Sequence, residues 1–77
     1  MNKARRQWLQ SVINALEEQK GEIESIQYEE QEAYDNLPEN LNDTERANNM
    51  YENIDDMEAA ASDLEDIISN LQDIVER

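Results

Sequence analysis

Asp35-Asn36-Leu37-Pro38-Glu39-Asn40 lies at the midpoint of the 77-residue chain and divides it into two long segments. Pro38 is the only proline, and a proline pushes the residue before it out of helical geometry. A helix that arrives from the N-terminal side is therefore expected to stop near Asn36 or Leu37. The neighbouring Asp and Asn residues favour turns. This stretch predicts a chain reversal between two helices.

The segment after the turn has the pattern of a coiled-coil helix. Asn40 or Asn42 is expected to cap it, with Asp43 and Glu45 in its first turn, where the helix dipole favours acids. Apolar residues then recur at alternating spacings of three and four, which is the a/d heptad repeat. The predicted seam consists of Ala47, Met50, Ile54, Met57, Ala61, Leu64, Ile68, Leu71 and Val75. Beside it lie Ala60, Ile67 and Ile74, which widen the apolar stripe.

The segment before the turn follows the same rule with more interruptions. Its predicted seam consists of Leu9, Val12, Leu16, Ile23, Ile26, Ala33 and Leu37. Gln19 and Glu30 occupy seam positions, and Glu30 is interpreted either as a buried carboxylate or as a side chain that reaches solvent. Gly21 falls mid-helix, where it costs about 1 kcal/mol relative to alanine. It is either a weak point or a place of close helix approach or kinking.

These patterns predict an all-α protein that forms one domain over residues 1–77. Helix 1 is expected at about 3–36, the turn at about 36–41 and helix 2 at about 42–76. The result is an antiparallel, coiled-coil-like helical hairpin. Because the widened stripe exceeds what one neighbouring helix covers, we expect a homodimer in which two hairpins form an antiparallel four-helix bundle. Binding of a different partner to this stripe is the competing interpretation.

Charge is abundant and unevenly placed along the chain. Twenty acidic and six basic residues give a net charge of −14. Residues 1–10 carry +3, from Lys3, Arg5 and Arg6, whereas three bases and twenty acids from residue 11 onward give −17. No apolar run approaches the ~18 residues of a membrane span. The basic start leads into no apolar segment, so a secretory signal is not expected, and we predict a cytoplasmic protein.

The residues needed for catalysis or for a metal site are missing from the pattern. Histidine and cysteine are both absent, which removes the usual general bases, thiolate nucleophiles and zinc ligands. Most carboxylates lie off the seam, on the solvated face, where a general acid or base is not activated. Neither a glycine-rich phosphate loop nor an EF-hand loop is present. We therefore expect no enzyme activity, no metal and no cofactor.

The acidic body suggests binding to a protein that has a basic surface. Direct contact with nucleic acid is not expected, because a body at −17 repels phosphate. A hairpin whose helices are ~45–50 Å long would carry about one charge per ~3 Å, roughly half the density of duplex DNA. DNA mimicry is thus feasible. The candidate partner-binding acids are Glu52, Asp55, Asp56, Asp63, Asp66 and Asp73. The alternative is a structural or scaffolding homo-oligomer whose charge only maintains solubility.

The basic head and the single base after the turn each have two interpretations. The stretch Lys3–Trp8 is a small anchor for a partner, or a solvated helix start whose Trp8 covers the end of the bundle. Arg46 is the only base between residues 21 and 76. It is expected to form a structural clasp with Glu39, Asp43 or a carboxylate of helix 1, with a partner contact as the alternative. Tyr34 and Leu37 are expected to pack under the turn.

A central motif carries a resemblance to known sequences. It runs from Glu29-Glu30-Gln31-Glu32 through Asp35-Asn36-Leu37-Pro38-Glu39 to Glu45-Arg46. With the heptad tail, it resembles a group of small acidic proteins of phages and mobile elements of Gram-positive bacteria, which share a DEEQ-x-x-x-DNLPE-x-L-x-x-x-ER core. The resemblance covers about residues 27–77. It implies a phage or mobile-element accessory role in a bacterial host cell, including inhibition of a host defence or nucleic-acid-binding protein. The tail departs from that group, whose tail is richer in Glu-Glu-Ala. In this chain residues 48–49 are both Asn and residues 55–56 are both Asp.

Overall fold

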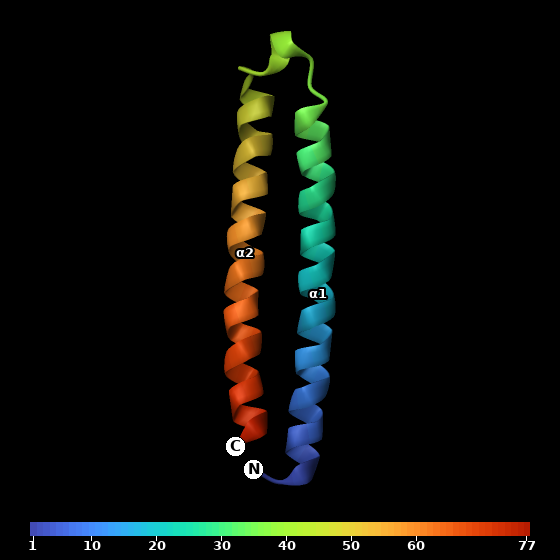
Figure 1. Cartoon of the computed structure of the whole chain (residues 1–77), viewed down its shortest axis with the longest axis vertical. Helices are drawn as coiled ribbons and strands as arrows, with labels where there is room; N and C mark the ends of the chain where they lie inside the picture. The colour runs from blue at the N-terminus through green and yellow to red at the C-terminus, as the bar shows by residue number, and fades with distance from the viewer.

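A computed structural model of all 77 residues shows two long helices that pack side by side in opposite directions (Figure 1). Helix α1 spans Lys3–Asp35 and helix α2 spans Glu45–Glu76. Between them lies a short 3-10 helix, η1, at Glu39–Leu41. The Cα trace measures 60 Å by 14 Å by 13 Å, and both termini lie at the end opposite the turn. The chain is therefore an all-α helical hairpin, as the periodicity predicts.

Helix α1 begins and ends close to the predicted residues. Asn2 caps its start, because its Oδ1 accepts a hydrogen bond of 2.9 Å from the backbone N–H of Arg5. The helix ends at Asp35, one residue before the predicted end. The N–H of Asn36 still donates to the carbonyl of Glu32, and then Pro38, which has no N–H, cannot continue the pattern.

Helix α2 begins three residues later than predicted, and the expected caps Asn40 and Asn42 are wrong. Thr44 caps the helix, and its Oγ1 accepts a hydrogen bond of 3.2 Å from the N–H of Ala47. The residues of η1 and Asn42 are held in a tight turn in which the N–H of Leu41 donates to the carbonyl of Pro38. Asn42 has helical φ and ψ, whereas Thr44 has the extended backbone that an N-cap requires.

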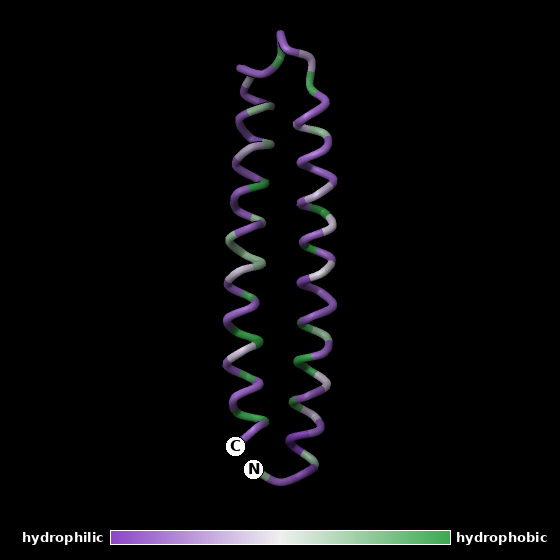
Figure 2. The backbone as a smooth tube through the Cα atoms, in the orientation of Figure 1, coloured by the Kyte–Doolittle hydropathy of each residue, from purple (hydrophilic) through white to green (hydrophobic).

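The predicted seam of α2 is the side of the helix that turns away from solvent. Five of its residues are buried, namely Ala47, Met50, Ile54, Ala61 and Ile68. The others are half-buried, namely Met57, Leu64, Leu71 and Val75. Figure 2 shows hydrophobic residues recurring along both helices, many of them on the edges that face the other helix.

The seam of α1 consists of two lines of residues, each with a spacing of seven. One of these two lines differs from the prediction. Leu9, Leu16, Ile23 and Leu37 are half-buried at the predicted positions. The second line lies one residue later than predicted and consists of Ile13, Lys20, Gln27 and Tyr34. The prediction of Val12, Gln19, Ile26 and Ala33 as seam residues is wrong for the hairpin.

Solvent exposure separates the two candidate lines of α1. Ile13 is 0% exposed, whereas Val12 is 40% and Ile26 is 53% exposed. Both lines keep the same heptad spacing, and the predicted line carries three apolar residues against two in the observed line, so the apolar pattern favours the wrong line. Packing favours the observed line, because the long side chains of Lys20 and Gln27 lie beside the small Ala61 of α2. The apolar stems of long polar side chains can be buried in this way.

Gly21 lies within α1 without interrupting it. A Cβ added to this residue would meet nothing within 4 Å, and its φ is not positive. Close helix approach at Gly21 is therefore excluded, and the glycine is a weak point in a continuous helix.

The corrected seam makes a testable prediction about two isoleucines of α1. Ile13→Ala should lower the free energy of unfolding by about 2–5 kcal/mol, because it leaves a cavity at a fully buried position. At chain concentrations low enough for the hairpin to be monomeric, Ile26→Ala should cost less than half as much, because its side chain is already half in water there. Urea unfolding followed by circular dichroism measures both values. Equal losses would contradict the seam described here.

Candidate binding surfaces

The hairpin has two long sides of different chemistry, because each helix carries one line of residues on either side of its seam. The acidic side is formed by Gln10, Glu17, Glu24 and Gln31 of α1 with Tyr51, Glu58, Glu65 and Gln72 of α2. The apolar side is formed by Val12, Gln19, Ile26 and Ala33 of α1 with Asn53, Ala60, Ile67 and Ile74 of α2. Two grooves support this division. One is lined by Glu24, Glu58 and Glu65, and the other by Ile26, Asn53 and Ala60.

On the acidic side, Lys20 is the one base that pairs with carboxylates. Its Nζ lies 3.5 Å from Glu24 Oε1 and 3.4 Å from Glu65 Oε2, so it joins a neighbour on its own helix to one on α2. Partial burial opposes the charged form of Lys20. The two carboxylates outweigh that effect and raise the pKa of Lys20 above its ordinary value of 10.5.

The six predicted partner-binding acids line the outer surface of α2. Glu52, Asp55, Asp56, Asp63, Asp66 and Asp73 are all exposed, and none forms an ion pair. They lie between positions 52 and 73, and these twenty-one helical steps correspond to about 32 Å at ~1.5 Å per residue. Of the twenty carboxylates in the chain, only Glu30 is even half-buried. The acids thus form an extended surface and no enclosed site.

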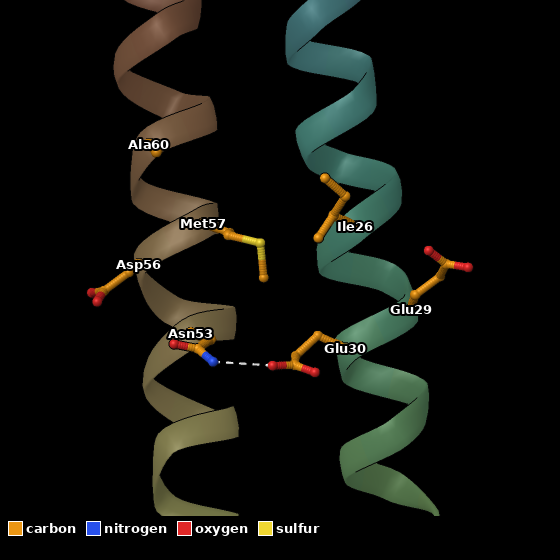
Figure 3. Close-up of a pocket in the computed structure, with 7 residues that line it drawn as sticks. All are labelled: Ile26, Glu29, Glu30, Asn53, Asp56, Met57 and Ala60. Carbon is orange, nitrogen blue, oxygen red and sulfur yellow. Dashed lines mark hydrogen bonds between the residues drawn. The ribbon is translucent and has the colours of Figure 1, made fainter.

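On the apolar side, a shallow groove of about 540 Å³ lies near the middle of the hairpin. Figure 3 shows Ile26 of α1 and Met57 of α2 pointing toward each other across it, while Glu29 and Asp56 point away. One edge is closed by Asn53 Nδ2, which donates a hydrogen bond of 3.1 Å to Glu30 Oε2. Glu30 is thus a half-buried carboxylate with a neutral partner on α2, a pairing that the spacing alone does not reveal.

The apolar side continues toward the end that holds the termini. Ile67 is 49% exposed and Ile74 is 38% exposed, although both are large and apolar. Trp8 is 72% exposed, and with Met1 and Val12 it lines a second hollow of about 280 Å³. Within the single hairpin the indole of Trp8 covers no helix end and extends this apolar side, and its predicted place at the end of a bundle stays a prediction.

The turn end is held by aromatic contact and not by Arg46. Arg46 forms no ion pair, so the predicted clasp with Glu39, Asp43 or a carboxylate of α1 is wrong. The rings of Tyr34 and Tyr51 lie 6.1 Å apart between centroids at an interplanar angle of 53°, a favourable tilted arrangement. Leu37 is half-buried in the same region.

The structure contains no group of three or more Asp or Glu side chains placed to hold a metal ion. Neither helix has a segment that is long and apolar enough to cross a membrane. No protein-family model, curated protein or solved structure matches this chain. The two sides of the hairpin therefore remain its candidate binding surfaces.

The Lys20 contacts generate a prediction about pH and salt. Because the folded-state pKa of Lys20 is raised, its pairing stabilises the folded chain at pH values below 10.5 and is lost as the pH rises further. Lys20→Gln should lower the melting temperature at neutral pH and low salt. The deficit should shrink in high salt and again above pH 10.5. Lys3→Gln is the control, because Lys3 has no carboxylate partner. An equal deficit in both variants would show that only net charge matters.

Proposed function

We propose that this chain is a binding protein that presents an acidic, DNA-like surface to a protein with a basic surface. The observation that carries the proposal is the exposure of nineteen of the twenty carboxylates, only two of which pair with a base. Uncompensated surface charge of this kind steers association with a partner of the opposite sign. The six acids on α2 would take the place of phosphates.

The charge density of one hairpin is less than half that of duplex DNA, and that of two hairpins approaches it. A net charge of −14 over a length of 60 Å is about one charge per ~4 Å, against one per ~1.7 Å in duplex DNA. Two hairpins side by side would carry about one charge per ~2 Å, which approaches the density of DNA. Dimerisation would therefore strengthen the resemblance to nucleic acid as well as cover apolar surface.

A role in binding fits the residues better than a role in catalysis. General acid–base catalysis uses side chains held in a desolvated or partnered environment. Here the carboxylates are spread over the surface, and Glu30, the only half-buried one, already accepts a hydrogen bond from Asn53. The chain offers no histidine or cysteine to act in their place.

The central motif favours an accessory role in a phage or mobile element. On the resemblance of residues 27–77 to such proteins, we place the chain in the cytoplasm of a bacterial host, where it inhibits a defence protein or a nucleic-acid-binding protein. A host protein that binds DNA would offer the positive surface that the acids of α2 require.

The apolar side favours a second candidate, self-association into a structural or scaffolding homo-oligomer. Ile26, Ile67 and Ile74 form an exposed apolar line that continues to Trp8, and such surfaces mark interaction sites. In this proposal two hairpins form a four-helix bundle and the charge maintains solubility. The two candidates are compatible, since four of the six acids of α2 lie away from the apolar side and only Asp56 and Asp63 lie along its rim.

Affinity capture from a lysate of the natural host, at about 50 and 200 mM salt, tests the acidic-surface proposal. A captured nucleic-acid-binding protein is then purified, and the chain is titrated against its nucleic acid. The chain should displace the nucleic acid from the captured protein. Its apparent affinity for that protein should fall by on the order of 10-fold or more between the two salt concentrations. Salt-insensitive binding that depends on Ile67 would contradict mimicry.

Two variants of equal net charge test whether the acids of α2 form the binding surface. The first variant is Asp55→Asn, Asp56→Asn, Asp63→Asn and Asp66→Asn. The matched control on α1 is Glu17→Gln, Glu18→Gln, Glu22→Gln and Glu32→Gln. The concentration needed to displace the nucleic acid should rise at least 10-fold more for the α2 variant than for the control. Both variants should remain fully helical. Equal losses would mean that net charge alone drives binding.

A further inference from the structure

We propose that the apolar side docks on the same side of a second copy that points in the opposite direction, about a two-fold axis at the level of Gln19 and Ile67. This inference rests on the self-association proposed above. It names the contact surface, the direction of the second copy and the residues that meet. The acidic sides of both copies remain on the outside of the resulting four-helix bundle.

The apolar side consists of three layers at equal spacing. Ile26 and Ala60 line one groove, and the Lys20–Glu65 and Tyr34–Tyr51 contacts place Ile26 opposite the stretch of α2 between Met57 and Ala60. Ala60 is therefore the residue of the apolar line of α2 that lies nearest to the level of Ile26. Seven residues back along α1 and seven forward along α2 lead to the level of Gln19 and Ile67. A further heptad leads to Val12 and Ile74. The Gln19 and Ile67 layer therefore lies midway between the two others.

Reversal of the second copy about the middle layer brings the outer layers together. Val12 then meets Ile26 of the second copy, and Ile74 meets Ala60 of the second copy. Ile74 of each copy thus enters the groove beside the small Ala60 of the other copy, so a large residue packs against a small one. At the axis, Ile67 meets Ile67 of the second copy, and the two Gln19 amides can hydrogen-bond to each other.

The charges along the rim of the apolar side select this direction. On α1, the rim is acidic near the turn, at Glu22 and Glu29, and not acidic near the termini, at Ala15 and Trp8. With the copies reversed, Glu22 lies near Ala15 and Glu29 near Trp8 of the second copy. With both copies pointing the same way and α1 on α2, acids of one copy would lie beside acids of the other.

The rim of α2 has the same asymmetry. It is acidic at Asp56 and Asp63, whereas Asn70 and Arg77 lie nearer the termini. Reversal places Asp63 near Asn70 and Asp56 near Arg77 of the second copy, which makes an opposite-charge pair. In the same-direction arrangement, Asp63 would lie near Glu22 and Asp56 near Glu29. Only the reversed arrangement relieves the repulsion between two chains of charge −14.

The size of the surface is sufficient for a stable dimer. The Cα trace outlines a face 60 Å long and 13–14 Å wide, or about 800 Å². The face is therefore large enough to accommodate a standard interface, which buries ~800 Å² per partner. The central layers of this face consist largely of exposed branched aliphatic side chains, with Trp8 at one end. A short segment of another protein would cover only part of this length.

Cysteine cross-linking tests the arrangement directly, because the chain has no cysteine of its own. A disulfide needs Cα atoms within ~7 Å of each other. Ile67→Cys alone should oxidise to a covalent dimer in more than half of the chains. Ile26→Cys should cross-link to Val12→Cys in a mixture but only weakly to itself. Tyr28→Cys, which is exposed away from the apolar side, is the control and should remain unlinked.

Failure of Ile67→Cys to self-link would overturn the proposal, and so would a monomer in sedimentation equilibrium of the unmodified chain. A same-direction dimer would cross-link Gln19→Cys to Ile67→Cys, which would also overturn it. Dissociation of the dimer by Ile67→Asp, but not by Tyr28→Asp, would support it.

These measurements use no basic partner. A monomer that retains salt-dependent competition would refute the dimer alone, whereas a dimer without competition would refute the acidic-surface proposal alone.

Discussion

Packing of the continuous apolar seam of α2 against the partly polar seam of α1 is the interaction on which the rest of the structure depends. It holds two helices together although the chain carries a net charge of −14. It also decides which residues flank the seam. If α1 were rotated so that Val12 and Ile26 faced α2, those side chains would be buried and the apolar side would lose its α1 half, leaving Ile67 and Ile74 of α2. The position of one line of residues thus determines whether the hairpin has a second hydrophobic surface.

Polar residues within the seam of α1 help to explain why this alignment is adopted. Lys20 lies beside Ala61 and reaches Glu65, and Glu30 accepts a hydrogen bond from Asn53. Polar side chains at seam positions lower stability but favour one alignment of the helices, because a shift leaves them without partners. The long stems of Lys20 and Gln27 also fill space that alanine leaves open. Specificity of pairing therefore comes from α1, and most of the buried apolar surface comes from α2.

Much of the fold could be predicted from the sequence, and the errors have physical causes. The turn at Pro38 and the seam of α2 follow from backbone geometry and from an uninterrupted heptad repeat. The seam of α1 could not be chosen from spacing, because Val12 and Ile13 begin two equally regular lines. The cap at Thr44 depends on the 3-10 helix after Pro38, which no local pattern indicates. The exposed acids of α2 were placed by the repeat, but the Lys20 and Glu30 contacts require knowledge of which residues face each other across the hairpin.

The hairpin depends on an apolar seam that overcomes strong electrostatic self-repulsion. Thermal unfolding followed by circular dichroism at increasing ionic strength measures that balance most directly. Salt screens repulsion between exposed carboxylates and leaves apolar packing largely unaffected. The melting temperature should therefore rise steadily with added salt and level off once the charges are screened. A melting temperature that is flat or falls with salt would mean that repulsion is not what the seam opposes, and it would contradict the account.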